Sequence, residues 1–135
     1  MDLRQGFTME FLRVSSYEGT STTGKIQMGG GLKMEHLEGK DVILVEDIID
    51  TGTTLFHLVP YLKEQAKTIQ SIETATLLTK RLEEPAKYQA KYVGFSIPNH
   101  FIIGYGLDYN ELYRDLKDIW VISKRGIEFD AKSLD

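Results

Sequence analysis

The 135-residue sequence contains no cysteine, which excludes disulfide bridges, thiolate nucleophiles and cysteine metal ligands. It has no secretory signal pattern and no apolar run near the ~20 residues that a membrane-spanning helix needs. A basic excess is also lacking, because the formal net charge is -4. That charge gives no support for broad binding to nucleic acid or to anionic membranes. These absences favour a protein of the reducing cytoplasm that binds neither nucleic acid nor membranes.

The composition that is present is typical of one globular domain. Hydrophobic residues make up 41% of the chain and charged residues 27%, so we predict a single domain over residues 1–135. The segment Glu18–Lys40 is rich in glycine, serine and threonine. It predicts a long flexible loop, with a hairpin near Gly29–Gly31, and loops of that length are commonly functional.

Short apolar segments between turn residues predict the strands. Asp41–Glu46 is an apolar run bounded by charges, the pattern of a strand buried on both faces of a parallel sheet. A helix is predicted after it from helical spacing of the apolar residues Leu55, Leu58, Val59, Leu62 and Ala66. Pro60 predicts a kink or an early end of that helix. Further strands are predicted at Met9–Tyr17, Ser71–Thr79, Lys91–Ser96, Phe101–Tyr105 and Ile119–Ser123. This order of elements predicts an α/β domain with a parallel sheet.

Two adjacent acids, Glu46 and Asp47, stand at the end of the Asp41–Glu46 strand. Buried carboxylates there are costly unless they bind something, and this edge of a parallel sheet is where such folds bind ligands. Neighbouring carboxylates can accept hydrogen bonds from the 2- and 3-hydroxyls of a ribose. They can also bind Mg²⁺ directly or through water.

The segment Asp50–Thr54 follows these acids and opens the predicted helix. Backbone N–H groups and the helix dipole at such a position attract a phosphate, and Gly52 lets the backbone come close to it. Each of these residues, taken singly, is explained more simply as a polar strand end or a helix cap. The complete string predicts a ribose 5-phosphate site. A dinucleotide site has less support, because neither G-x-G-x-x-G nor a Walker A loop occurs.

At these residues the sequence resembles a known family. VILVEDIIDTGTT closely resembles the motif with which phosphoribosyltransferases bind phosphoribosyl pyrophosphate (PRPP). FLRVSSYEGTSTTGK, ATLLTKR, YVGFSIPNHFIIGYGLDYNELYRDL and IWVIS resemble the hypoxanthine-guanine phosphoribosyltransferases of purine salvage. The resemblance extends from about Phe11 to Phe129. It implies the type I phosphoribosyltransferase fold, a mainly parallel sheet flanked by helices with part of a C-terminal hood.

The resemblance also implies a glycosyltransferase reaction. PRPP and hypoxanthine or guanine, with xanthine as a third candidate, would give IMP or GMP and pyrophosphate. Mg²⁺ would neutralise the leaving group. Glu46 and Asp47 would hold the ribose and this metal. Asp50 would be the general base toward purine N7, or would simply stabilise charge on the ring. Arg114 would bind pyrophosphate. The 5′-phosphate loop would consist of Thr51, Gly52, Thr53 and Thr54, with Thr53 where many relatives carry lysine.

Four further residues are implied to bind the purine. Lys80 would donate to its 6-oxo group, which selects hypoxanthine and guanine over adenine. Phe101 would stack on the base, and the backbone of Ile102 would contact its edge. Asp108 would lie near the purine 2-position and act as a further metal-associated acid. Without the resemblance, a lysine at a strand end such as Lys80 is explained more simply as a solvated charge, and an aromatic in a strand such as Phe101 as a core residue.

A lid and a missing segment complete the resemblance. Ser15–Gly24, led by Ser16 and Tyr17, resembles the family's flexible lid, within a loop of about residues 15–40, and such a lid excludes water. The family has further N-terminal sequence, with a strand and a Lys-Gly loop that grips pyrophosphate. Because that loop is not found here, we expect the chain to be the C-terminal portion of the domain and to be poorly active or to aggregate by itself. Relatives are dimers or tetramers, so we expect a homo-oligomer.

Two other functions stay open. The chain could be a PRPP-binding regulatory module, although it has no basic DNA-binding segment, or an inactive fragment of the enzyme that associates with another chain. Lys80 and Phe101 favour the enzyme, since a pure PRPP sensor has no need of a base pocket.

Overall fold

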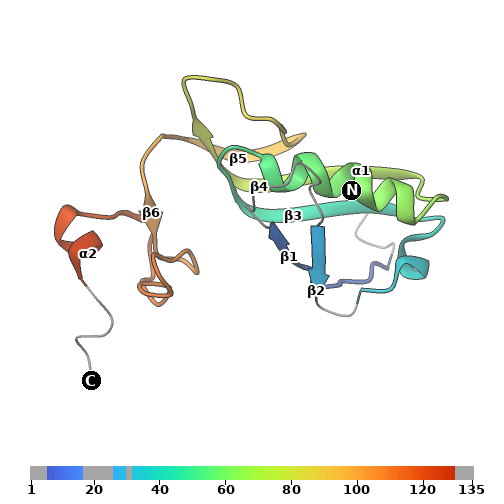
Figure 1. The fold of residues 1–135 in the computed structure, drawn as a ribbon, viewed down its shortest axis with the longest axis horizontal. Coiled ribbons are helices and arrows are strands. Elements are labelled where there is room, and N and C mark those ends of the chain that lie inside the picture. Colours follow the sequence, from blue (N-terminus) through green and yellow to red (C-terminus); the bar gives the residue numbers. More distant parts are fainter. Residues whose placement is uncertain (1–5, 17–25, 30–31, 130–135) are drawn as a thin grey trace.

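A computed structural model describes residues 6–16, 26–29 and 32–129 (Figure 1). Its centre is a three-stranded sheet in the order β3–β4–β5, formed by β3 (Asp41–Ile49), β4 (Ser71–Arg81) and β5 (Tyr92–Pro98). Both strand pairs are parallel, with Val42 beside Ile72 and Leu78 beside Phe95. The predicted α/β class with a parallel sheet is therefore confirmed.

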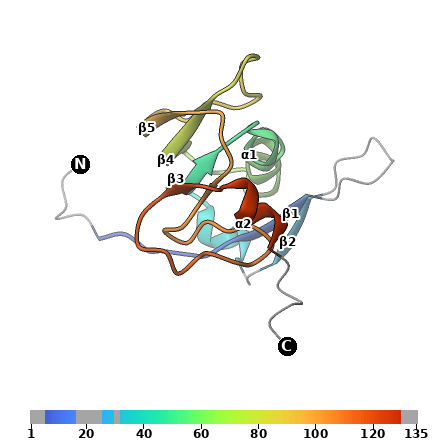
Figure 2. The same ribbon diagram turned by 90° about the vertical axis from the view of Figure 1, so that its left-hand side faces the viewer.

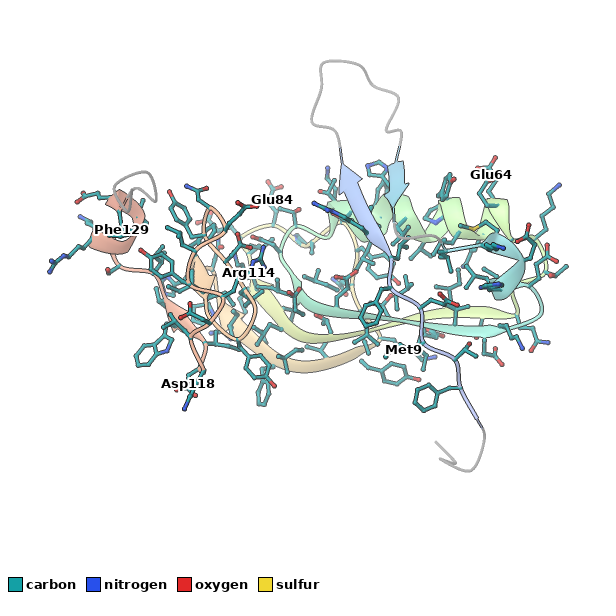
Figure 3. The ribbon with its side chains drawn as sticks, turned by 90° about the horizontal axis from the view of Figure 1, so that it is seen from below. Met9, Glu64, Glu84, Arg114, Asp118 and Phe129 are labelled. Atoms are coloured by element: carbon teal, nitrogen blue, oxygen red, sulfur yellow. The ribbon has the colours of Figure 1, made fainter. Side chains whose placement is uncertain are left out.

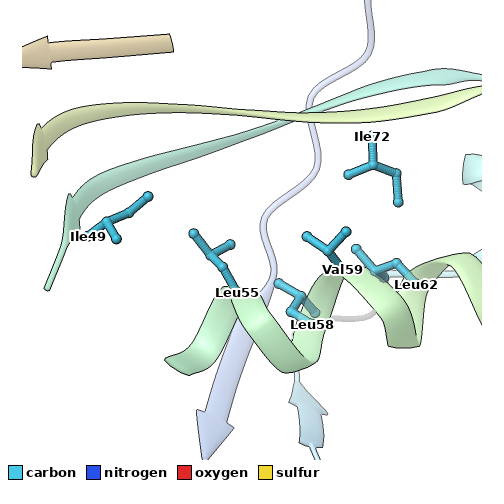
Figure 4. Packing of buried hydrophobic residues seen from close by; sticks show 6 residues of the cluster. All are labelled: Ile49, Leu55, Leu58, Val59, Leu62 and Ile72. Carbon is cyan, nitrogen blue, oxygen red and sulfur yellow. The ribbon is translucent and has the colours of Figure 1, made fainter. Parts of the chain in front are cut away.

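The helix α1 (Thr53–Gln65) packs against one face of this sheet (Figure 2). Its apolar stripe meets the sheet in one cluster, shown in Figure 4 and composed of Ile49, Leu55, Leu58, Val59, Leu62 and Ile72. Full burial of one such side chain stabilises the fold by about 1.5–3 kcal/mol, so this cluster is a principal source of stability.

Pro60 does not end the helix, so of the two predicted outcomes, a kink or an early end, the early end is wrong and the kink stays a prediction. The helix continues past Pro60 to Gln65, and Pro60 itself is exposed on the side away from the sheet. Leu62, beyond the proline, is almost inaccessible to solvent. Packing of an amphipathic face supplies most of a helix's stability in a protein, and here it holds the last turn despite the missing backbone donor.

The opposite face of the sheet is open in the described part of the chain. Successive side chains of a strand point to opposite faces, so Val42 and Leu44 pack toward α1 while Ile43 and Val45 point away from it. Ile43 is 52% exposed and Val45 is 79% exposed. The prediction of a strand buried on both faces is therefore wrong for β3 among the residues that the structure describes.

The N-terminal segment contains less strand than predicted. β1 (Arg13–Ser16) pairs antiparallel with β2 (Ile26–Gly29), and Met9–Leu12 lies outside any strand. Met9 and Phe11 are exposed, with no neighbouring strand in residues 6–16, 26–29 and 32–129 to pair with. The predicted loop over Glu18–Lys40 contains β2 and a short 3₁₀ helix, η1 (Met34–Leu37). Residues that connect β1 to β2 lie outside the described ranges.

The C-terminal part forms a small separate unit beyond the end of the sheet from which β4 and β5 exit (Figure 1). β6 (Ile102–Ile103) pairs antiparallel with β7 (Trp120–Val121), and α2 (Lys124–Glu128) follows. Both strands are shorter than predicted. Gly104 has a φ of +86° and Tyr105 one of +56°, so the chain turns directly after Ile103.

The helix α2 was not predicted. Its signal is Ser123, whose side chain accepts a hydrogen bond of 3.1 Å from the backbone N–H of Gly126 in the manner of a helix N-cap. Within the described ranges, no helix has the length and apolar character needed to cross a membrane.

Candidate active site

The turn between β3 and α1 borders a pocket. β3 ends at Ile49 and α1 begins at Thr53, so the residues 50–52 connect the carboxyl end of a strand to the start of a helix. The pocket has a volume of about 180 Å³. It is lined by Glu46, Ile48, Ile49, Asp50, Thr51, Gly52, Thr53, Thr54 and Leu55. The structure thus brings the predicted phosphate loop, Asp50 and Glu46 around one cavity.

The start of α1 is built to present backbone N–H groups. Gly52 occupies the N-cap position with φ of +72°, a left-handed conformation, and has no side chain with which to cap the helix, while the backbone N–H of Thr53 makes a long contact of 3.5 Å to Thr51 Oγ1. Thr51 Oγ1 and Thr53 Oγ1 lie 3.0 Å apart and share a hydrogen bond. The first N–H groups of a helix have no partner within the helix, so these donors and the dipole together favour an anion at this pocket.

The two adjacent acids point to opposite faces of the sheet, because side chains alternate along a strand, and their predicted joint role at the ribose stays a prediction. Glu46 lines the pocket and is half-buried, whereas Asp47 is exposed on the other face of the sheet. Asp47 Oδ1 accepts a hydrogen bond of 2.6 Å from the backbone N–H of Ile48. Burial raises the pKa of Glu46 above its ordinary value of 4.5, and the neighbouring charge of Asp47 raises it further.

A lysine and an aspartate meet at the carboxyl edge of the sheet. Lys80 lies inside β4, and its Nζ is 2.6 Å from Asp50 Oδ2. The lysine side chain is only 9% exposed, while the aspartate is 50% exposed. A hydrogen-bond donor and an acceptor therefore stand side by side next to the phosphate loop. Such a pair can bind a ligand that offers an acceptor and a donor on one edge.

An aromatic ring stands beside this pair. Lys80 Nζ lies 5.9 Å from the centre of the Phe101 ring, and Phe101 is about half exposed. Tyr109 meets Phe101 edge to face, with the ring centres 5.3 Å apart. Ile102 is buried in β6. Sequence reasoning missed Tyr109, whose only signal was an aromatic residue in the same polar turn as Asp108.

Asp108 and Arg114 bind each other. Arg114 Nη2 is 2.8 Å from Asp108 Oδ1, and Arg114 Nη1 donates to the backbone carbonyl of Gly106 at 2.7 Å. The Asp108 carboxylate also accepts from the backbone N–H of Glu111. Figure 3 shows Arg114 among the loops of the C-terminal unit. These contacts are those of a polar turn, so a role of either residue in ligand binding stays a prediction.

The remaining predicted residues are not gathered at the pocket. No three His, Asp or Glu side chains of the described ranges come together to hold a metal, so Asp108 does not join Glu46 and Asp47 in one metal set. Ser16 belongs to β1, and its lid partner Tyr17 lies outside the described residues.

Comparisons with known proteins agree with this geometry. The family described as "Phosphoribosyl transferase domain" matches residues 3–110. The hypoxanthine-guanine phosphoribosyltransferase of Mus spretus is 43% identical over 119 residues, which is 88% of this chain and 55% of that protein. For the Homo sapiens enzyme, the identity is 42% over the same length. The chain spans about half the length of these curated relatives.

Solved structures give the same result. A hypoxanthine phosphoribosyltransferase from Staphylococcus aureus is 43% identical, with a TM-score of 0.72 over 86% of this chain and 62% of that one. One from Trypanosoma cruzi, solved as a ternary complex with its substrates, is 40% identical, with a TM-score of 0.74 over 88% of this chain and 63% of that one. The resemblance predicted from the sequence is confirmed, and the chain belongs to the phosphoribosyl transferase domain family.

Proposed function

We propose that this chain provides the ribose-phosphate and purine sites of an enzyme that transfers a 5-phosphoribosyl group from PRPP to hypoxanthine or guanine. The observation that carries the proposal is the contact of Lys80 with Asp50 beside the phosphate loop. A 6-oxopurine offers two neighbouring atoms on one edge, the 6-oxo oxygen and N7. Lys80 can donate to the oxygen while Asp50 accepts a proton from N7, and adenine offers an amino donor to Lys80 instead.

The proposed reaction assigns each group a task. The backbone N–H groups at the start of α1 hold the 5′-phosphate, and Phe101 stacks on the base. A purine nitrogen forms the bond to the ribose carbon, and pyrophosphate leaves with the bonding electrons. Asp50 accepts the N7 proton or stabilises the charge that develops on the ring. The products are IMP or GMP and pyrophosphate, and a Trypanosoma cruzi relative is known in complex with IMP.

Mg²⁺ fits the carboxylate that lines the pocket. This ion is usually bound by one or two carboxylates together with substrate phosphates, and Glu46 supplies one carboxylate next to the phosphate loop. When bound, Mg²⁺ would neutralise charge on the leaving pyrophosphate. We assign the metal to Glu46 first. Asp47 and Asp108 remain candidate metal ligands, either through a bridging water molecule or after a movement of the chain. Among the purine bases, xanthine remains a candidate substrate beside hypoxanthine and guanine.

The alternative functions lead to different binding behaviour. A regulatory module would bind PRPP but would not distinguish one purine from another. An inactive fragment would bind neither PRPP nor a purine nucleotide. We also propose a cytoplasmic location and a dimer or tetramer, since these accompany the purine-salvage function.

Calorimetric titration of the chain with IMP, GMP and AMP tests the proposal. We expect IMP and GMP to bind more tightly than AMP, because only they present an acceptor to Lys80. K80M should remove this preference and leave the affinity for ribose 5-phosphate nearly unchanged. K91M is the matched control, because Lys91 binds the exposed Glu73 away from the pocket. Equal binding of all three nucleotides by the unmodified chain would refute the base site.

A further inference from the structure

The connection between β4 and β5 lies directly against the phosphate loop. The backbone N–H of Lys87 donates to the carbonyl of Thr51 at 2.8 Å. A Cβ added to Gly52 would lie 2.7 Å from both the backbone N and the backbone O of Tyr88. Nothing larger than glycine fits at that position, so the residues 87–88 form the wall behind the phosphate loop.

The side chain of Tyr88 fastens this wall to the centre of the sheet. Its hydroxyl lies 2.8 Å from Thr74 Oγ1, and Thr74, in the middle of β4, has no exposed surface. The ring packs against the core cluster beneath α1. A buried hydroxyl that loses its partner costs about 1–3 kcal/mol, so each of the two side chains holds the other in place.

The hydrogen bond to Thr51 also fixes the direction of a peptide group. The carbonyl of Thr51 and the N–H of Gly52 belong to the same trans peptide, in which the two bonds point in opposite directions. Because Lys87 holds the carbonyl, the N–H of Gly52 points away from residues 87–88. Glycine permits many backbone conformations, so without this bond the peptide could turn its carbonyl toward the anion.

We propose that Tyr88 is a positioning residue for the phosphate loop. Through its bond to Thr74 it holds Lys87 against Thr51, and that bond keeps the Gly52 N–H available to a phosphate monoester. The inference rests on the proposed function, because it assumes that the pocket binds the 5′-phosphate of a ribose. Tyr88 touches no ligand in this scheme and acts only through the backbone of residues 51–52.

Titration of ¹⁵N-labelled protein with ribose 5-phosphate, followed by NMR, tests the inference. We expect Y88F to weaken binding about five- to tenfold, the effect of one lost hydrogen bond, and to reduce the ligand-induced shift of the Gly52 amide. T74V should weaken binding similarly, whereas T74S keeps the hydroxyl and should bind as the unmodified chain does. Y92F removes the same atom from an exposed tyrosine in β5 and should have no effect.

Hydrogen exchange separates positioning from general destabilisation. In Y88F and T74V the Lys87 amide should exchange faster, while the Leu62 amide in α1 keeps its protection. Faster exchange of both amides, or unchanged affinity for ribose 5-phosphate in both variants, would overturn the role of Tyr88 and leave the proposed function standing. Absence of binding by the unmodified chain would instead refute the phosphate site itself and the inference with it.

Discussion

The two faces of the β3–β4–β5 sheet differ in burial although their sequences are similarly apolar. On the face toward α1, Ile72 and Leu78 are almost inaccessible to solvent. On the opposite face, Ile43 and Val45 of the neighbouring strand are largely exposed. Apolar side chains stabilise a fold only when they leave water, so the α1 face supplies most of the sheet's packing energy. The open face contributes exposed apolar surface, the kind that associates with other surfaces.

The largest test of this comparison is a pair of core and surface truncations. L62A should lower the free energy of unfolding by about 2–5 kcal/mol, because it leaves a cavity between α1 and the sheet. V45A, on the open face, should change it by no more than about 0.5 kcal/mol. Urea unfolding followed by circular dichroism measures both. A large loss in V45A would mean that the open face is packed in solution, and the comparison would fail.

A second pair concerns two glycines at opposite ends of β3. Gly39 and Gly52 have nearly the same φ, +67° and +72°, but only Gly52 lies against the backbone of Tyr88. G39A should cost about 1–2 kcal/mol for the left-handed conformation alone. G52A should cost about 1–3 kcal/mol more, because the added methyl meets packed backbone. Thermal unfolding of both variants measures the difference between their losses of stability. Equal losses would show that the backbone of residues 87–88 moves aside at little cost in free energy.

A smaller effect on stability is expected from replacing Glu46, the acid whose side chain lies on the α1 side of the sheet. Because burial raises the pKa of Glu46, its neutral form is favoured in the folded state. Its contribution to stability is therefore complete below the unfolded pKa and is lost as pH rises through the folded pKa. E46Q should stabilise the protein at pH 7 by about 0.5 kcal/mol, since solvent screens a half-buried group.

The pH dependence and the neighbouring acid provide the controls for this effect. The gain in E46Q should disappear below pH 4, where the carboxyl is neutral in both states. D47N removes only the neighbouring charge, the lesser cause of the shift, and should stabilise less. Melting temperatures from pH 3 to 8 measure all three proteins. A gain in E46Q that persists at pH 3 would contradict this explanation.

The smallest change in stability is expected on the open face. Replacing Ile43 and Val45 together by threonine keeps β-branched residues in the strand while making the surface polar. The free energy of unfolding should stay within about 0.5 kcal/mol, and association measured by light scattering should decrease. Unchanged association would show that this face does not bring copies of the chain together.

The sequence predicted the α/β class, the parallel strands and the helix because each depends on local periodicity. It also placed Asp50, Thr51 and Gly52 correctly around one pocket, since the end of a strand and the start of a helix define such a turn. It did not predict that Glu46 and Asp47 point to opposite faces, because the predicted strand ended at Glu46, whereas β3 continues to Ile49 and places both acids inside the strand. Tyr88 and Tyr109 were missed for a different reason. Their contacts, to Thr74 and Phe101, join positions that only the folded chain brings together.

Lys80 belongs to β4, the central strand, where the pairing with β5 extends from Ala75 to Arg81. The backbone of a residue in such a strand is held by hydrogen bonds to its neighbours, so it moves less than the backbone of the surrounding turns. Base preference, if the proposed role of Lys80 holds, is then set by the sheet before any ligand arrives. Directed evolution that randomises only the loops around the pocket would alter affinity and turnover, whereas acceptance of adenine would require a substitution within β4 itself.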